Sequence, residues 1–203
     1  MEQRSEEWFK ARLGKATGSR FNDVMTTLRS GGEAAARKNY RAELVAERLT
    51  GVRNEMWTSP AMQWGIDNEP LARLAYELET GNEVEDAPFV PHPEMEAGVS
   101  PDGYIGKDGL IEIKCPNTAT HIETLKKSEV PRQYIAQVQG QLWITGRKWC
   151  DFVSFDPRLP ENAQMIVVRV ESDPVYQAEL EDEITDFLEG VDKECKFIKE
   201  YKG

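Results

Sequence analysis

Cysteine and histidine are scarce in this chain, which has three Cys and two His among 203 residues. The cysteines stand far apart, at positions 115, 150 and 195, and His92 and His121 lack the spacing of zinc ligands. Without a secretion signal, a disulfide framework is also excluded. We therefore expect a reduced, cytoplasmic protein with no metal site built from Cys or His.

Long apolar runs are missing as well. No stretch approaches the roughly 20 apolar residues of a membrane-spanning helix, and the opening M-E-Q-R-S-E-E is unlike a signal peptide. Disorder is excluded too, because hydrophobic residues make up 39% of the chain and include five Trp and seven Phe. One folded domain with no membrane association is the expectation.

A net positive charge is the third absence, since the formal charge is −11. This argues against a protein that coats duplex nucleic acid through its overall charge. The first sixty residues nevertheless carry slightly more Lys and Arg than Asp and Glu, and the acidic excess lies mainly in residues 171–189. A carboxylate cluster that holds a metal ion also lowers the formal charge. A local basic groove therefore stays compatible with the composition.

The most informative stretch covers residues 100–116, S-P-D-G-Y-I-G-K-D-G-L-I-E-I-K-C-P. Asp108-Gly109 between two extended runs predicts a hairpin turn, because Gly accepts the backbone angles of tight turns. Side chains alternate along a strand, so the second run should have two different faces. One face carries Leu110, Glu112 and Lys114, and the other carries Ile111, Ile113 and Cys115.

Two carboxylates, Asp102 and Glu112, should converge on one point of this hairpin. Like charges at short range are unstable unless a cation lies between them, and ligands that are all oxygen select Mg²⁺ or Mn²⁺. Lys114 beside such an ion could orient a water or stabilise charge developing on a phosphate. Gln137, on a helix that follows, could add a hydrogen bond. The alternative is a surface hairpin whose polar face meets water.

Hydrophobic periodicity predicts a single α/β domain with a central mixed sheet flanked by helices. We expect a helical N-terminal part over about 1–81, a sheet core over about 83–170 and an acidic C-terminal helix over about 174–201. The predicted helices span 5–13, 17–28, 33–50, 60–79, 117–127, 131–146 and 174–201, and the predicted strands span 84–90, 98–105, 110–115, 149–155 and 165–170.

Glu69 stands directly before Pro70 in the segment W-G-I-D-N-E-P. Proline inside a helix removes one backbone hydrogen bond and usually marks a kink or a start. We therefore expect Glu69 at an irregular point of the fourth helix. Taken alone, a single Glu in an acidic protein favours a solvated surface charge.

Asp102, Glu112, an apolar residue and Lys114 together resemble the motif of the PD-(D/E)XK nuclease superfamily, including Pro101 before the Asp. Five ordered blocks over about residues 3–158 make the resemblance more specific. They resemble the phage-type recombination exonucleases, also described as lambda exonuclease-like or YqaJ-like. The blocks are R-S-E-E-W-F-K-A-R-L-G-K-A-T-G-S, W-G-I-D-N-E-P-L-A-R, G-V-S-P-D-G, L-I-E-I-K-C-P and Y-I-A-Q-V-Q-G-Q-L-W-I-T-G.

The resemblance implies a restriction-endonuclease-like core and a role for each matched residue. The implied metal ligands are Asp102, Glu112 and the carbonyl of Ile113, with Glu69 joining or supporting the cluster. Lys114 is the implied catalytic lysine, with Gln137 as its neighbour. A 5′-phosphate of the DNA end is held by Arg12, Ser19 and Ser100. For Arg12 the alternative is a helix-surface ion pair with Glu6 or Glu7. Gly18 departs from the family pattern, which has Ala there.

The resemblance also implies an activity and partners. The implied enzyme is an Mg²⁺-dependent 5′-to-3′ exonuclease, with Mn²⁺ as a possible substitute, that degrades one strand of duplex DNA from a 5′-phosphorylated end. A ring-shaped homotrimer and a single-strand annealing protein as recombination partner are implied as well. Two alternatives stay open at this point: a site- or structure-specific endonuclease of the same superfamily, and a non-catalytic module that binds DNA ends.

Overall fold

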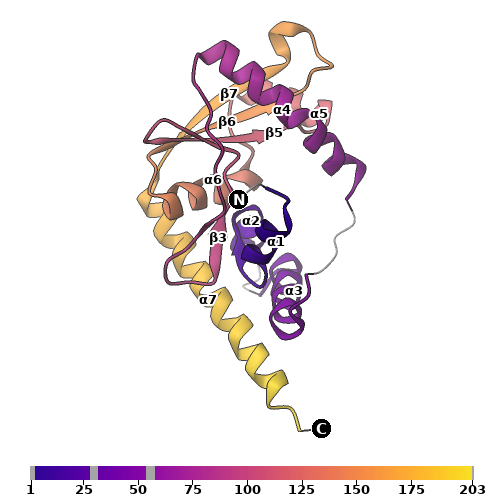
Figure 1. Cartoon of the computed structure of the whole chain (residues 1–203), viewed down its shortest axis with the longest axis vertical. Coiled ribbons are helices and arrows are strands. Elements are labelled where there is room, and N and C mark those ends of the chain that lie inside the picture. Colours follow the sequence, from indigo (N-terminus) through magenta and orange to yellow (C-terminus); the bar gives the residue numbers. More distant parts are fainter. Residues whose placement is uncertain (1–2, 28–31, 54–57, 203) are drawn as a thin grey trace.

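A four-stranded mixed sheet forms the centre of the protein, for which a computed structural model describes residues 3–27, 32–53 and 58–202. Its strand order is β4-β5-β6-β7, with β5 and β6 parallel and the two outer pairs antiparallel. The mixed sheet flanked by helices is therefore confirmed (Figure 1). The strands are β4 (Gly103–Ile105), β5 (Gly109–Lys114), β6 (Trp149–Phe155) and β7 (Met165–Glu171).

A second, three-stranded sheet has the order β1-β3-β2. It consists of β1 (Ala16–Thr17), β2 (Val90–Pro91) and β3 (Ala97–Val99). The single strand expected over 98–105 is therefore wrong, because β3 and β4 belong to different sheets and Asp102 lies in the link between them. The strand expected over 84–90 is reduced to β2 and one bridge from Glu85 to Tyr104, since prolines in this stretch cannot donate to a ladder.

The hairpin between β4 and β5 is confirmed, but its turn lies elsewhere than expected. Gly109 is already the first residue of β5 and pairs with Ile105. The residue with positive φ is Gly106, at +52°. The turn therefore spans 106–108 and uses Gly106 in place of Gly109 for the left-handed conformation that other residues avoid.

The helices agree with the predicted positions in most places. They are α1 (Glu6–Arg12), α2 (Phe21–Met25), α3 (Ala35–Thr50), α4 (Pro60–Thr80), α5 (Thr118–Lys127), α6 (Arg132–Thr145) and α7 (Pro174–Lys199), with short 3-10 turns η1 (Gly18–Arg20) and η2 (Glu161–Ala163). The helix expected over 17–28 is wrong at its start, because Thr17 pairs with Gly98 in the small sheet. Its expected end at 28 lies outside the described residues.

Helix α4 runs without interruption through Pro70. The irregular point expected at Glu69 is therefore wrong. Proline at this position removes only the bond to the carbonyl four residues earlier, and the remaining bonds of a 21-residue helix keep its course. Ala72 and Tyr76 are its buried residues, and they pack against the sheet.

Helices α4 and α6 cover opposite faces of the four-stranded sheet. Ile111 and Ile113 of β5 belong to the cluster that includes Ala72 and Tyr76 of α4, whereas Leu110 belongs to the cluster that includes Val138 and Leu142 of α6. The alternation predicted for residues 110–115 is confirmed. Glu112 and Lys114, on the same side as Leu110, are consequently directed toward α6.

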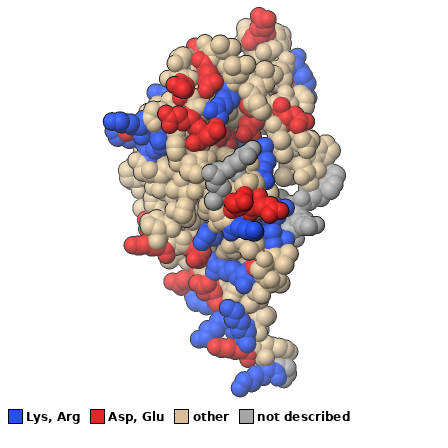
Figure 2. Space-filling view, in the orientation of Figure 1, with Lys and Arg blue, Asp and Glu red and all other residues tan. Residues whose placement is uncertain are grey.

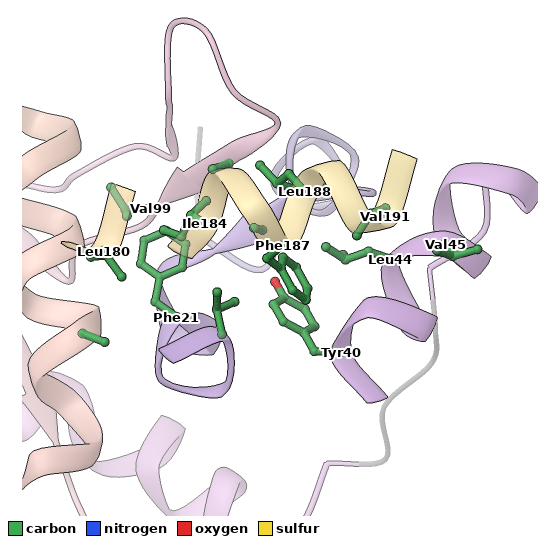
Figure 3. Close-up of a cluster of buried hydrophobic side chains, with 14 of the residues drawn as sticks. Phe21, Tyr40, Leu44, Val45, Val99, Leu180, Ile184, Phe187, Leu188 and Val191 are labelled. Carbon is green, nitrogen blue, oxygen red and sulfur yellow. The ribbon is translucent and has the colours of Figure 1, made fainter. Parts of the chain in front are cut away.

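A separate hydrophobic cluster joins α2, α3 and α7 (Figure 3). Within it Tyr40 stacks on Phe187 with ring centroids 5.3 Å apart, and Phe21 packs between the helices. Helix α7 buries one apolar face that includes Leu180, Ile184 and Phe187, whereas Val175 in its first turn is 82% exposed. Figure 1 shows α7 running from the sheet past α3 to the C-terminus. In the described part of the chain no helix has the length and apolar character needed to cross a membrane.

Candidate active site

One cavity of about 620 Å³ collects every site residue that the sequence predicted. Its lining comes from α1, η1, α4, the link before β4, β5 and α6, which are segments far apart along the chain. Packing of α6 and α4 on opposite faces of the sheet leaves this space at the end of β5. The predicted residues that line it are Arg12, Ser19, Glu69, Ser100, Asp102, Glu112, Ile113, Lys114 and Gln137.

The carboxylate of Glu112 is held from three sides at the centre of the cavity. Gln137 Nε2 donates to Oε1 and Gln141 Nε2 donates to Oε2, each at 2.6 Å. Lys114 Nζ lies 2.5 Å from Oε1. Glu112 is only 1% exposed, and a buried carboxylate is costly unless it has such partners. One strand and one facing helix therefore fix its position.

Asp102 is held against the same strand, since its Oδ2 accepts the N–H of Ile113 at 2.7 Å. Burial raises the pKa of Asp102 well above its ordinary value, and the nearby charge of Glu112 raises it further. Lys114 and the hydrogen bond from Ile113 act in the opposite direction without cancelling this effect. The site therefore places two carboxylates where they repel each other, and a cation would relieve the repulsion.

Lys114 supplies one positive charge to this pair. Burial acts to lower the pKa of Lys114, but the charges of Glu112 and Asp102 outweigh it, so the net result is a raised pKa. Its ammonium also lies 5.2 Å from the ring centroid of Tyr134 on α6. Lys114 is accordingly a protonated hydrogen-bond donor at neutral pH in this arrangement.

The donors around the two carboxylates fit a hard divalent cation such as Mg²⁺. Asp102 and Glu112 offer oxygen only, and Gln141 Oε1 is a buried acceptor that has no partner among the described residues. A hydrated ion would satisfy such an acceptor. Within the described ranges, no three Asp, Glu, His or Cys side chains are gathered as a metal site. Glu69 lines the cavity, but its Oε2 accepts from Arg4 NH2 at 2.9 Å.

Arg12 forms a second group of donors in the same cavity. Its guanidinium lies 3.9 Å above the ring centroid of Trp8, and its NH1 donates to Ser100 Oγ at 3.2 Å. Burial lowers the pKa of Arg12 to about 10. The structure records no ion pair of Arg12 with Glu6 or Glu7, so the alternative of a helix-surface pair with either of them is wrong. The charge of Glu47 raises the pKa of Arg12 without cancelling the effect of burial, and a half-buried guanidinium in this setting fits a phosphate.

Ser100 links Arg12 to the segment that carries Asp102. Its Oγ accepts from Trp8 Nε1 at 3.0 Å and from Arg12 at 3.2 Å. With both acceptor positions used, its hydroxyl hydrogen is left to donate to another group. Ser19, on η1, lines the same cavity without a recorded hydrogen bond from its side chain among the described residues. Together these groups place hydrogen-bond donors beside the carboxylates, in an arrangement that fits an anion.

Among the cavity residues that had no role assigned from the sequence, Gln141, Trp8 and Arg4 contact predicted site residues. Gln141 could have been found, because it follows Gln137 by four residues and lies on the same side of a helix that is otherwise largely apolar. Trp8 likewise precedes Arg12 by four residues. Arg4 left no such signal, since its contact with Glu69 joins positions 65 residues apart.

Comparisons with known proteins identify the family of this chain. A family model described as the YqaJ-like viral recombinase domain matches residues 7–148. The alkaline exonuclease LHK-Exo from Laribacter hongkongensis has a structure that matches with a TM-score of 0.89 and 48% identity, covering 96% of each chain. A structure of LHK-Exo in complex with dAMP matches with a TM-score of 0.90, at the same identity and coverage.

A phage-related exonuclease from Haemophilus somnus 129PT shares the fold, with a TM-score of 0.68 and 18% identity over 92% of this chain and 96% of that one. No match was found among the curated proteins. The family model covers more than half of the chain, and LHK-Exo is similar over nearly all of it. The protein is thus an exonuclease homologue and belongs to the family of the YqaJ-like viral recombinase domain.

Proposed function

We propose that this protein is an Mg²⁺-dependent exonuclease that degrades one strand of duplex DNA in the 5′-to-3′ direction from a 5′-phosphorylated end. The observation that carries the proposal is the sharing of one cavity by two groups of residues. Asp102, Glu112 and Lys114 form a hydrolytic centre, and Arg12 with Ser100 forms an anion site. An enzyme that cuts next to a terminal phosphate needs both within reach of one nucleotide.

The residues of the chain have separate tasks in this proposal. Arg12 and Ser100, with Ser19, bind the terminal phosphate and set the register of the strand. Lys114 donates hydrogen bonds to the phosphate that is cut and stabilises its developing charge. Gln137 and Gln141 keep Glu112 in place.

Asp102, Glu112 and the carbonyl of Ile113 would hold Mg²⁺, or Mn²⁺ in its place, with Glu69 in support. The ion supplies a Lewis acid and an activated water when bound.

The mononucleotide bound to a relative supports the proposed product. LHK-Exo has been crystallised with dAMP, and removal of single nucleotides from a 5′-phosphorylated end releases molecules of this kind. The distance between the anion site and the carboxylates is limited by one cavity of about 620 Å³, which is a volume typical of a small-molecule site. A product of one nucleotide agrees with that size.

A ring-shaped homotrimer and a single-strand annealing partner also belong to the proposal, on the basis of the family resemblance. Charge supports enclosure of DNA over attraction by a broad basic surface. On the face shown in Figure 2, Lys and Arg side chains are interspersed with Asp and Glu side chains. With a net charge of −11, the counterion-release contribution to affinity is small, so enclosure by a ring would keep the enzyme on its substrate.

The polarity is tested with a linear duplex that carries different labels at its 5′ and 3′ ends, in Mg²⁺ and in EDTA. We expect the 5′ label to be released first as a mononucleotide, and no release in EDTA. A covalently closed circle of the same sequence should stay intact. Cleavage of the circle at a comparable rate would show an endonuclease, and binding of linear DNA without turnover would show a non-catalytic end-binding module.

Substitutions then test the proposed centre. Asp102→Asn and Lys114→Ala should each abolish cleavage while the affinity for DNA ends is retained. Asp108→Asn and Lys107→Ala are matched controls, because they remove the same charges from the turn of the same hairpin outside the cavity. If Lys114→Ala cleaves at the wild-type rate, the role proposed for this lysine is wrong.

A further inference from the structure

The two residues Gln3 and Arg4, here named the N-terminal strap, join opposite sides of the active-site cavity. Gln3 Nε2 donates to the carbonyl of Pro101 at 2.9 Å, directly before Asp102. Arg4 NH2 donates to Glu69 Oε2 at 2.9 Å on α4. Both residues line the cavity. The strap therefore lies between the candidate catalytic residues and the start of α1.

The backbone of the strap is held in an unfavourable conformation. Arg4 has φ of 69°, and Ser128 is the only other described residue apart from glycine with a positive φ. Side chains with a Cβ atom avoid this region, and it persists only where surrounding contacts impose it. The Arg4 and Glu69 side chains are 44% and 31% exposed, so their ion pair is screened by water. The Arg4–Glu69 ion pair is therefore easily replaced by another contact of Arg4.

Two cations compete for Glu69 in the proposed function. The guanidinium of Arg4 lies against Oε2 of Glu69, and a divalent ion in the neighbouring carboxylate cluster requires the same negative charge. A guanidinium beside that cluster also repels a dication. A DNA phosphate that enters the cavity offers Arg4 a better acceptor, because the planar guanidinium binds phosphate through two parallel hydrogen bonds.

We propose that Arg4 is a positioning residue that exchanges Glu69 for a phosphate of the DNA strand when substrate enters. The exchange leaves Glu69 available to the metal ion and anchors the strand at the mouth of the cavity. Metal binding and DNA binding then strengthen each other, and this coupling is reciprocal by linkage. The inference rests on the proposed function, because it requires both a metal ion and a DNA strand in this cavity.

Arg4→Gly is the informative variant, since glycine accepts the positive φ and the guanidinium is removed. We expect Mn²⁺ titrated calorimetrically into DNA-free protein to bind roughly 2- to 5-fold more tightly to Arg4→Gly than to wild type, as loss of a half-exposed competing ion pair implies. Lys107→Ala is the matched control for loss of one positive charge outside the cavity, and it should leave the Mn²⁺ affinity unchanged.

The second measurement is DNA-end binding in Mg²⁺, followed by fluorescence anisotropy on a Lys114→Ala background that does not cleave. Arg4→Gly should lower the slope of log affinity against log salt by about one, the value for one lost phosphate contact. Arg4→Lys should keep the slope, because it keeps the charge. The factor by which Mg²⁺ tightens DNA binding should also be smaller in Arg4→Gly than in its parent.

The outcomes separate this inference from the function on which it rests. Wild-type protein that binds Mn²⁺ and cleaves linear duplex, with an Arg4→Gly variant of equal Mn²⁺ affinity and equal salt slope, overturns the exchange alone. In that case the Arg4–Glu69 pair is an ordinary surface ion pair. Wild-type protein that binds no Mn²⁺ overturns the proposed metal site and the exchange together.

Discussion

Replacing Arg12 by methionine should remove the preference for 5′-phosphorylated ends without destabilising the protein. Methionine keeps much of the volume that packs on Trp8 but has neither charge nor donors. Burial lowers the pKa of Arg12 from its ordinary value to about 10, and at about 1.36 kcal/mol per pKa unit the net cost of the charge is roughly 3 kcal/mol. The nearby charge of Glu47 offsets only part of the effect of burial, so the arginine still weakens the folded protein.

A bound phosphate would recover much of that free energy. Recovery of half to all of it corresponds to roughly 10- to 100-fold in kcat/KM between 5′-phosphorylated and 5′-hydroxyl ends. We expect wild-type protein to show this preference and Arg12→Met to show almost none, with similar rates for the two proteins on 5′-hydroxyl ends. The assay is release of mononucleotides from two duplexes that differ only in the terminal phosphate.

Arg20→Met is the matched control. The Arg20 guanidinium also lies over an aromatic ring, 4.1 Å from the centroid of Tyr40, but it pairs with Asp23 and Glu43. Its loss should lower the thermal midpoint and leave the end preference intact, whereas Arg12→Met should keep or raise the midpoint. An equal loss of activity on both kinds of end, or a destabilisation by Arg12→Met as large as that by Arg20→Met, refutes the reasoning.

Three further predictions concern stability. Asp156 accepts from Arg158 and Thr118, and these bonds lower its pKa to about 2. A folded-state pKa below the unfolded one stabilises the protein above about pH 4, and this contribution is lost as pH falls through about 2. Asp156→Asn should therefore lower the free energy of unfolding by roughly 2 kcal/mol at pH 7 in urea titrations and by much less as the pH approaches 2. Gly140→Ala on α6 should lower the free energy of unfolding by roughly 1–3 kcal/mol, because the added Cβ would lie 2.4 Å from Phe21. Gly65→Ala has open space around it and should be neutral or stabilising when both variants are compared by thermal unfolding. The pKa of Asp102 is raised in the folded protein, so in EDTA its contribution to stability is lost as pH rises above about 4 through the raised value. Mg²⁺ should reverse this loss of stability. Identical thermal midpoints for wild type and Asp102→Asn across a pH series would contradict this prediction.

Sequence patterns predicted the structure correctly where it depends on residues that are close together in the chain. The alternation of residues 110–115 predicted which side chains share a face, and the structure confirms it. The helices predicted over 33–50 and 60–79 correspond to α3 and α4, which end at Gly51 and Gly81, two glycines with positive φ. Local rules failed at Thr17 and Pro70. Thr17 lies in a strand because it pairs with Gly98. Pro70 leaves α4 intact because one missing backbone hydrogen bond is a small loss compared with the packing of the helix on the sheet.

The sequence by itself determined which chemical groups the candidate site contains: two carboxylates, a lysine and an ordered set of blocks that resemble one family. Only the tertiary structure decided how these residues meet. It placed Gln141 against Glu112, joined Arg12 to Ser100 across 88 positions and turned Glu69 toward Arg4. Contacts of this kind depend on how α1, α4 and α6 pack around one strand, and no periodicity within a single segment encodes that arrangement.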